Sequence, residues 1–501
     1  MGALPPRAGE RPLVAVIYTH SHIDHYGGVK GITTEEDVAS GRVQVIAPEG
    51  FLEEAVSENV YAGNAMARRA IFQYGPLLPA GPTGAIDAGL GKSTSIGQST
   101  LIPPTLEIRE TGERHTVDGV EMEFFMAPGT EAPSEMLIWF PKWKLLDSAE
   151  DVTHTLHNLY TLRGAQVRDA KTWWKVLHGL IGRYGDDVEV IIAQHHWPVW
   201  GNGRIVDLIE HQRDLYKYLH DQVLHLANQG FTMVEIGEQL ELPDGIALKW
   251  ANRGYYGSVN HNAKAVYQRY LGWYDANPSH LWSLPPVEGA RKEVEYMGGA
   301  DAVLERARRD FEAGEYRWVA EVASKVVYAD PRNAEARELN AAALEQLGFQ
   351  QENPTWRNAF LHGAYELRNG VPQIALGVAS PDTVAAMTPE MLLDYVGIRL
   401  DGPAAASEHR RIRWELGGDR AFLLELRNGV LIYTELGLGD HPEVDATLTA
   451  SKADFAAVVM GAQSVEEARE AGTFHVEGDD SAGVLFGLLS TFPPLFNIIE
   501  P

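Results

Sequence analysis

The 501-residue sequence contains no cysteine. This absence excludes disulfide bonds, thiolate metal ligands and a cysteine nucleophile, although it does not decide the cellular compartment. No apolar run reaches the length of a membrane span, so we expect no transmembrane segment. The first residues, Met1–Arg7, lack the apolar core of a signal peptide, and we therefore expect no export signal in this chain.

Positive charge is also scarce. The 42 lysine and arginine residues are outnumbered by 69 aspartate and glutamate residues, which gives a formal net charge of -27. Because nucleic acids are bound through basic surfaces, we expect no nucleic-acid partner. An anionic substrate would have to be attracted by local cations against the field of the whole protein. The hydrophobic content of 45% is ordinary for a globular protein, and the length predicts two to three domains.

Strand-like and helix-like runs alternate from residue 11 to about 275. The strand-like runs are Val43–Ala47, Met136–Phe140 and Val188–Ala193, and the helical patterns cover 52–72, 169–184 and 204–229. Alternation of this kind predicts an α/β layered domain, which we place at residues 1–280. Glycine and proline cluster between 75 and 104, which indicates a long functional loop over a site.

The next segment is alanine-rich and strongly helical. Its expected helices are Ala300–Ala313, Tyr316–Ala329, Ala334–Leu347 and Trp356–Arg368. Their spacing resembles tetratricopeptide hairpins, and a plain helical bundle fits equally well. We place this all-α domain at 281–372 and expect it to mediate oligomerisation, with a homodimer as the expected assembly.

The last segment, 373–501, has α+β character. Its expected strands are Arg411–Leu416, Ala421–Leu426 and Val430–Glu435, with helices at 389–400, 451–461 and 480–491. The segment resembles a sterol-carrier-protein-2-like domain, which would offer an apolar pocket suited to a long alkyl tail. A packing domain without a ligand is the alternative interpretation.

Three histidines and an aspartate lie within six residues, directly after the apolar run Leu13–Tyr18. At the end of such a strand His20 and His22 share one side, and Asp24 and His25 follow as the chain turns. Imidazole and carboxylate are ligands that zinc prefers, and four such groups are hard to bury without a cation. One metal could take the first pair and a second metal the other pair. An exposed polar loop is the alternative.

This motif, T-H-x-H-x-D-H-x-G-G, resembles the signature of the metallo-β-lactamase superfamily of binuclear metallohydrolases. The resemblance implies an αββα sandwich for the first domain. Because the superfamily fold normally has strands before the motif, we expect an N-terminally truncated sandwich with exposed sheet edges. Similar proteins are exported, so a periplasmic or secreted location is implied, although this chain shows no signal.

Four ligands within six residues cannot complete two metal sites, so further ligands must come from later in the chain. Glu131 lies in a tight Pro-Gly turn, Glu150 follows a strand-like stretch, and His195 ends an apolar run. All three sit at loop ends, where α/β folds gather their ligands. Asp147 and His196 compete with them for this role.

The general superfamily pattern has a histidine and an aspartate as its next two ligands, whereas this chain has Glu131 and Glu150. In this respect the chain resembles the alkyl sulfatase family. Its landmarks resemble the motifs Pro128–Pro133, Thr153–Gly164, His195–Gly201 and Arg253–Gly257. By position, the resemblance implies two zinc ions, one held by His20, His22 and Glu131, the other by Asp24, His25 and His195, with Glu150 shared. It extends over nearly the whole chain, including the helical and sterol-carrier-like segments.

The sulfate head carries one negative charge and suits the planar donors of Arg163 and Arg168. The resemblance places sulfate contacts in the same segment, at Asn158, Tyr160, Arg163 and Arg168. Two further histidines, His154 and His157, are expected to orient the carboxylates. Tyr255 and Tyr256 either line the pocket or simply pack.

The predicted reaction is hydrolysis of alkyl sulfates, such as dodecyl sulfate or secondary alkyl sulfates, by a metal-activated water. Catalytic roles are predicted for Asp24, Glu150 and His261, the last protonating or hydrogen-bonding the leaving group. The attack can break S–O or C–O. The alternatives are another hydrolase of the superfamily (a lactamase, thioesterase or phosphodiesterase) and a metal-free scaffold that binds lipids or partners.

Overall fold

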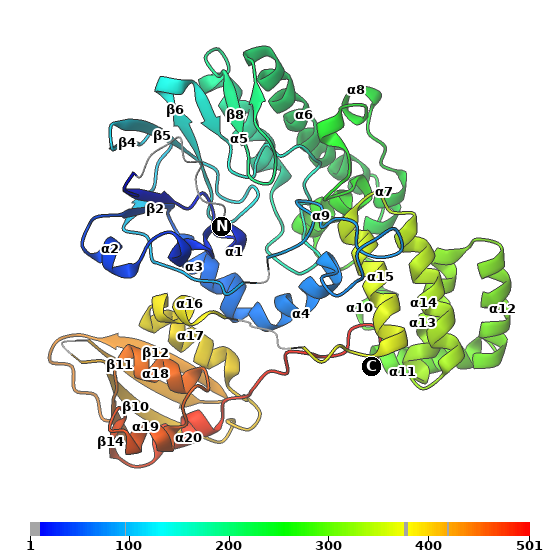
Figure 1. Cartoon of the computed structure of the whole chain (residues 1–501). Coiled ribbons are helices and arrows are strands. Elements are labelled where there is room, and N and C mark those ends of the chain that lie inside the picture. The colour runs from blue at the N-terminus through cyan, green and yellow to red at the C-terminus, as the bar shows by residue number, and fades with distance from the viewer. Residues whose placement is uncertain (1–10, 96, 375–378, 418–419) are drawn as a thin grey trace.

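The structure is a computed structural model that describes residues 11–95, 97–374, 379–417 and 420–501. The N-terminal residues for which we expect no export signal lie outside these ranges. Figure 1 shows three parts: a layered α/β part, a group of long helices, and an α+β part carrying the last strands. Among the described residues, no helix combines the length and the apolar character needed to cross a lipid bilayer.

Two sheets face each other in the first part. The smaller sheet is parallel, in the order β1 (Ala15–Ile17), β2 (Gln44–Pro48) and β3 (Leu106–Ile108). The larger sheet contains, in order, β4 (Arg114–Val117), β5 (Val120–Met126), β6 (Met136–Phe140), β7 (Leu145–Asp147), β8 (Val190–Ile192) and β9 (Val199–Trp200). Ile46 and Ile108 from one sheet pack with Phe124 and Ile138 from the other in one buried cluster. The predicted α/β sandwich is confirmed.

Helices cover the outer faces of the two sheets (Figure 1). The smaller sheet is accompanied by α1 (Ile23–Tyr26), α2 (Glu35–Ala39), α3 (Phe51–Val56) and α4 (Gly63–Tyr74). The larger sheet is accompanied by α5 (Ala170–Tyr184), α6 (Asn202–Ala227), α7 (Met233–Gln239), α8 (Asp244–Ala247) and α9 (Val259–Leu271). The helical pattern predicted as continuous over 52–72 is interrupted, because Ser57–Tyr61 forms a π-helical turn between α3 and α4.

A long connection joins α4 to β3. Between Tyr74 and Leu106 its described residues form no helix or strand, as the glycine and proline content predicts. Two contacts place this loop at the site. The Leu90 carbonyl accepts a hydrogen bond of 3.1 Å from His195 Nδ1. Gly89 lies so close to Tyr256 that a Cβ would come within 2.5 Å of the ring, and its φ of +97° also favours glycine.

The helical part consists of α10 (Pro278–Leu281), α11 (Pro286–Tyr296), α12 (Ala300–Glu312), α13 (Tyr316–Ala329), α14 (Ala334–Phe349) and α15 (Pro354–Asn369). Successive helices from α12 onward pack as neighbours and share one apolar core around Leu304, Val319 and Val326. The predicted limits of α13 agree with the structure, whereas α11 has no counterpart among the predicted helices.

The C-terminal part wraps helices over one five-stranded sheet. Its strands are β10 (His409–Glu415), β11 (Ala421–Arg427), β12 (Val430–Leu436), β13 (Ala446–Thr449) and β14 (His475–Gly478), in the order β12-β11-β10-β13-β14. Its helices are α16 (Pro381–Ala386), α17 (Pro389–Arg399), α18 (Lys452–Val459), α19 (Val465–Glu470) and α20 (Ser481–Gly487). The predicted α+β character is confirmed.

The three parts are packed against one another through buried contacts. Val56 and Val60, from the first part, belong to the same apolar core as Trp414 and Phe455 of the last part. After α20 the chain returns to the helical part, where the Tyr328 hydroxyl donates to the Ile498 carbonyl at 3.0 Å (Figure 1).

Arg68 and Glu366 form a fully buried ion pair between α4 and α15. Two guanidinium nitrogens donate to the two carboxylate oxygens at 2.8 and 2.6 Å, and Arg68 Nε donates to the Phe496 carbonyl at 2.7 Å. The pair therefore joins all three parts of the chain. His362 Nε2 donates to the same carboxylate at 3.0 Å. The buried charge of Glu366 is therefore compensated by Arg68 and His362 together.

We expect Arg68→Met to destabilise the protein by about 3–5 kcal/mol, because it leaves the Glu366 carboxylate buried without its counter-ion. Denaturant unfolding followed by tryptophan fluorescence measures the change. The matched control is Arg368→Met, which removes partly exposed pairs with Glu338 and Glu345 and should cost less than about 2 kcal/mol, at most about 1 for each pair. Equal losses in the two variants would contradict the assignment of Arg68 as a structural junction.

Candidate metal centre

The first histidines stand where β1 ends and meets the larger sheet. The Thr19 carbonyl accepts from Met136 N at 2.9 Å, and Ser21 N donates to the Ser134 carbonyl at 3.2 Å. These bonds continue the chain of β1 alongside the start of β6. His22 caps α1, which carries Asp24 and His25 in its first turn. The four side chains therefore come from one rigid strand end and one short helix.

The later candidates come from three turns of the larger sheet. Glu131 lies in the turn between β5 and β6, where Gly129 has a φ of +79°. Glu150 follows β7 and His195 follows β8. Ala149 and His195 both adopt left-handed backbone, with φ of 48° and 69°. Non-glycine residues rarely do so, and when they do they are often found at functional sites.

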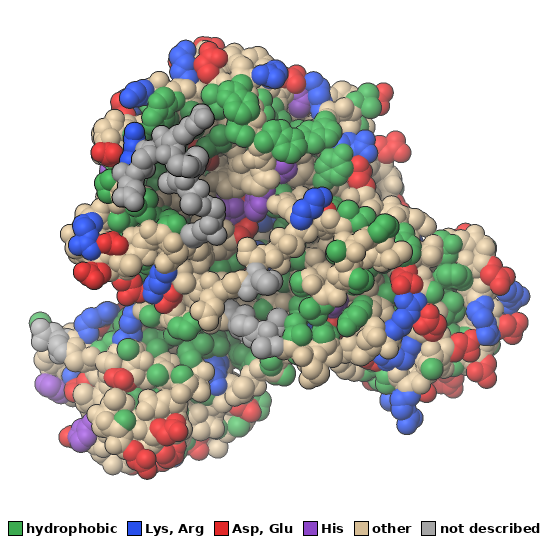
Figure 2. Space-filling model, in the orientation of Figure 1, with side chains coloured by type: hydrophobic (Ala, Val, Ile, Leu, Met, Phe, Trp, Pro, Cys, Tyr) green, Lys and Arg blue, Asp and Glu red, His purple; other side chains and the backbone are tan. Residues whose placement is uncertain are grey.

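Seven side chains meet here in two groups. Within each group the ligand-type atoms lie within 4.8 Å of one another, the groups being His20, His22, Glu131 and Glu150, and Asp24, His25 and His195. The two groups contain the residues of the two implied ligand sets, with Glu150, implied to be shared, in the first group. Figure 2 shows histidine side chains on the floor of a hollow in this face of the molecule. Asp147 and His196, the competing candidates, belong to neither group.

Glu150 stands between the two groups. Its Oε2 atom lies 3.4 Å from His20 Nε2, 3.1 Å from His25 Nε2 and 3.3 Å from His195 Nε2. His22 Nδ1 lies 2.7 Å from Glu131 Oε2, so this ring presents Nδ1 to the cluster while His20 presents Nε2. One carboxylate oxygen thus faces imidazoles of both groups.

Burial and charge set the protonation of these groups. Burial raises the pKa of Glu131, but the Arg168 guanidinium and His22 outweigh it and lower that pKa to about 2. Burial also opposes ionisation of Glu150, yet His195 and His157 hold its pKa well below the ordinary value. Burial and nearby His25 lower the pKa of His20 to about 4. Ionised carboxylates and a neutral imidazole are the forms that bind metals.

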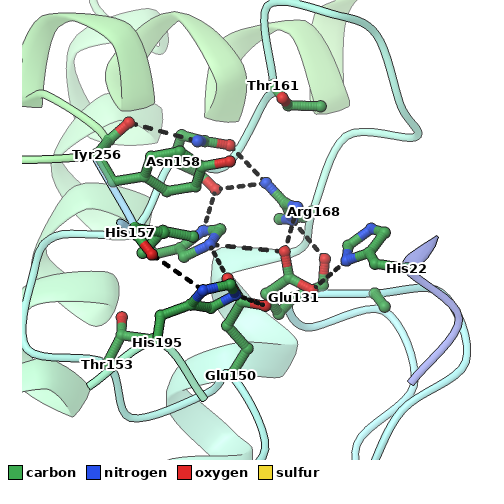
Figure 3. Close-up of polar contacts among 12 residues, drawn as sticks. His22, Glu131, Glu150, Thr153, His157, Asn158, Thr161, Arg168, His195 and Tyr256 are labelled. Carbon is green, nitrogen blue, oxygen red and sulfur yellow. Dashed lines mark hydrogen bonds and ion pairs between the residues drawn. The ribbon is translucent and has the colours of Figure 1, made fainter. Parts of the chain in front are cut away.

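The predicted sulfate-binding residues lie beside this cluster, as Figure 3 shows for Asn158 and Arg168. Arg168 donates to Glu131 and, through Nη1, to the Asn158 carbonyl at 2.9 Å and to the Asn158 side chain. Arg163 pairs with the Glu58 carboxylate and donates to the Gly164 carbonyl at 3.1 Å. Each of these two arginines is therefore matched to a carboxylate, and each of those carboxylates contacts His22.

Three family models match the chain: metallo-beta-lactamase superfamily over residues 5–195, alkyl sulfatase dimerisation over 232–370, and alkyl sulfatase C-terminal over 377–501. The sequence is 50% identical over 495 residues to a linear primary-alkylsulfatase of a Pseudomonas species, covering 98% of this chain and 73% of that protein. The chain belongs to the alkyl sulfatases of the metallo-β-lactamase superfamily.

Two further relatives agree with this membership. An alkyl/aryl-sulfatase of Saccharomyces cerevisiae is 48% identical over 494 residues, with 98% of this chain and 76% of that protein covered. The solved structure of a stereoselective inverting sec-alkylsulfatase from a Pseudomonas species superposes with a TM-score of 0.95 at 44% identity, covering 98% of this chain and 78% of that one. The fold of this alkyl sulfatase is therefore that of a solved relative over almost its whole length.

His157 and His154, both predicted to orient carboxylates, behave differently in this alkyl sulfatase. His157 Nε2 lies 3.1 Å from Glu150 and 3.5 Å from Glu131, as the prediction has it (Figure 3). His154 packs instead against His196 and Trp197, with ring centroids 5.0 and 5.2 Å away. Among the described residues no carboxylate contact of His154 is found, so its expected role stays a prediction.

His261 has both ring nitrogens engaged within the protein. Trp356 Nε1, on α15, donates to His261 Nδ1 at 3.0 Å, so Nδ1 carries no proton, and Nε2 donates to the Tyr160 carbonyl. Burial lowers the pKa of His261 to about 4. The contacts favour a neutral ring that positions the 158–163 segment. The Tyr160 hydroxyl itself accepts from Arg69 at 3.1 Å.

Two buried carboxylates escaped sequence reasoning. These are Glu135 and Asp151, which are buried close to Glu131 and Glu150. Burial and the neighbouring carboxylates raise the pKa of Glu135 and that of Asp151 well above their ordinary values. Glu135 accepts from Thr130 Oγ1 at 3.0 Å, from Ala132 N at 2.9 Å and from Glu150 N at 3.3 Å. It therefore ties together the two turns that carry the carboxylate ligands. No local pattern distinguishes such a residue in the sequence.

We expect Glu135→Ala to weaken metal retention by about 10- to 100-fold, because both carboxylate-bearing turns lose their common acceptor. Glu135→Gln should have an intermediate effect, since the amide oxygen keeps one of the two acceptor positions and the amide nitrogen cannot replace the other. Metal analysis after graded chelator competition measures the effect, with the exposed Glu110→Ala as the control. Equal metal retention in Glu135→Ala and the unaltered protein would refute this positioning role.

Proposed function

We propose that this alkyl sulfatase hydrolyses alkyl sulfate esters to alcohol and inorganic sulfate with two zinc ions. The observation that carries the proposal is the gathering of seven imidazole and carboxylate side chains in two adjacent groups, with one Glu150 oxygen facing His20, His25 and His195. The relatives named as primary and secondary alkylsulfatases support the substrate class.

The residues present fit a cation. Among the described residues, buried His20 Nε2 and Glu131 Oε2 have imidazole or carboxylate atoms nearby but no hydrogen bond of acceptable geometry, which is costly unless a cation satisfies them. Imidazole and carboxylate donors without thiolate suit zinc. We assign His20, His22 and Glu131 to one ion, Asp24, His25 and His195 to the other, and Glu150 to both. Bound zinc would supply hydroxide near neutral pH and neutralise charge at the reacting centre.

The protein's own groups then bind and orient the substrate. Asn158 and Arg168 hold each other and the Glu131 carboxylate in place, and Arg163 supplies guanidinium donors to the sulfate oxygens. Asp24 is the most exposed of the seven ligand-type residues, with 58% of its side chain accessible, so it lies where solvent and substrate enter. Hydrolysis in isotopically labelled water distinguishes the two possible cleavages. The label enters the alcohol if the C–O bond breaks and the sulfate if the S–O bond breaks.

The organisation of the chain supports three proposed domains at 1–280, 281–372 and 373–501. Each contains an apolar core of its own, although the core of the third includes Val56 and Val60 from the first. An alkyl-binding role for the third domain stays a prediction. Its interior is filled by Trp414, Phe422 and Phe455, with the indole and Phe455 rings stacked 3.9 Å apart.

Purified protein should release inorganic sulfate from dodecyl sulfate, and chelator should abolish the release. Glu150→Ala should reduce turnover at least about a hundredfold, because it removes the group placed between both metal sites. Sulfate assay and zinc content are measured together. Zinc-loaded wild type that turns over a lactam, thioester or phosphodiester but no alkyl sulfate would favour another superfamily hydrolase, and zinc-free protein without turnover would favour a scaffold.

The helical domain, together with the end of α9 and the segment that follows it, exposes large apolar side chains of the kind that mark protein interfaces. Those between residues 270 and 318 are Tyr270, Leu271, Trp273, Leu281, Trp282, Leu284, Tyr296 and Trp318. Trp282 and Tyr296 are 96% and 94% exposed. The dimerisation family model covers all of them, so we propose that they form the contact between two copies of the chain.

We expect the protein to be a homodimer at micromolar concentration and the double variant Trp282→Ser, Tyr296→Ser to shift it toward monomer. Light scattering after gel filtration gives the mass. Leu438→Ser is the control, because Leu438 is 84% exposed in the C-terminal domain, away from this surface. A double variant with unchanged dimer mass would place the contact elsewhere.

A further inference from the structure

Glu58 places a carboxylate between the anion site and the metal site. Its side chain is only 13% exposed. One oxygen, Oε1, pairs with Nη1 of Arg163, and the other, Oε2, lies 3.6 Å from His22 Nε2. His22 presents its other ring nitrogen, Nδ1, to Glu131. Glu58 therefore contacts both a predicted metal ligand, His22, and the predicted sulfate-binding residue Arg163.

Glu58 lies on a π-helical turn that is packed against the C-terminal domain. Residues Ser57–Tyr61 form a π-helical turn, a rare conformation that is frequent at functional sites. The C-terminal domain braces the turn on its outer side: Val60 lies in that domain's core, and the Tyr61 hydroxyl donates to the Met391 carbonyl at 3.2 Å. Glu58 is thus held toward the site by a domain that contributes none of the predicted ligands.

A charge count gives the consequence. Arg163 is matched by Glu58, whereas the Glu131 carboxylate that pairs with Arg168 is also assigned to one of the metal ions, so Arg163 offers an entering anion no uncompensated positive charge of its own. An entering anion shares Arg163 with the Glu58 carboxylate. A sulfate monoester carries one negative charge, whereas a phosphate monoester carries nearly two above its second pKa of about 6. The second charge would face Glu58 at close range in a site shielded from solvent.

We propose that Glu58 is a specificity residue that makes this site prefer singly charged sulfate esters to doubly charged phosphate esters. The inference rests on the proposed function, in which Arg163 receives the sulfate group. Glu58 acts through Arg163 and through charge, and therefore changes which head group binds rather than the reaction itself.

The test compares two octyl ligands that differ in head-group charge and are not alkyl sulfate substrates: octane sulfonate, with one negative charge, and octyl phosphate, with nearly two at pH 8. Calorimetry on the zinc-loaded full chain gives both dissociation constants without turnover. In Glu58→Gln the affinity for octyl phosphate relative to octane sulfonate should rise at least about tenfold over the wild-type ratio.

Two further variants separate charge from structure. Glu58→Asp keeps the charge and should keep the wild-type ratio. Glu54→Gln is the matched control. Glu54 and Glu58 line one small cavity, but Glu54 contacts Gln166 rather than Arg163, so this variant should leave the ratio of the two affinities unchanged. Zinc content, measured in every sample, should stay constant.

The outcomes are distinguishable. An unchanged ratio in zinc-loaded Glu58→Gln overturns the specificity role. A parallel loss of both ligands in Glu58→Gln and Glu58→Asp means that Glu58 only holds Arg163, and overturns it as well. Failure of the proposed function shows differently, as wild-type protein that binds neither ligand and releases no sulfate.

Discussion

Burial of several carboxylates at one junction is the constraint around which this alkyl sulfatase is organised. Glu131, Glu135, Glu150 and Asp151 are nearly inaccessible to solvent at the edge of the larger sheet. Ionised groups at such density require compensation, and the chain supplies it in three ways. Arg168 and the imidazoles neutralise two of the four, burial next to other carboxylates raises the pKa of Glu135 and Asp151 and so disfavours their charged forms, and the remaining donor atoms suit a divalent cation.

The other two domains complete this arrangement at a distance. The helical domain supplies Trp356, whose indole sets the tautomer of His261 and so holds the backbone of the segment that contains Arg163. The C-terminal domain packs on the π-helical turn that presents Glu58. Catalytic geometry in this chain therefore depends on interfaces between domains, and a substitution at either interface can alter the site without touching it.

Residue chemistry in the sequence pointed to the histidine candidates, and the resemblance to a family was needed to select Glu131 and Glu150. His20, His22, Asp24 and His25 are close in sequence, and Glu131, Glu150 and His195 follow apolar runs that end at the same sheet edge. Glu135 and Glu58 could not be found in this way. Each is a single acidic residue whose partners are brought to it by folding, so nothing within a few residues distinguishes it from a surface carboxylate. The π-helical turn was missed because 52–72 keeps a helical pattern throughout.

The sequence by itself determined which groups are available and which elements form, because ligand chemistry and hydrophobic periodicity are local properties. It placed β6 and α13 at their observed limits and predicted the α/β, all-α and α+β order of the chain. Tertiary structure alone decided which atoms meet: the single Glu150 oxygen that faces both groups, the left-handed backbone at His195, and the pairing of Arg163 with Glu58. These depend on contacts between residues tens to hundreds of positions apart, and only packing sets such contacts.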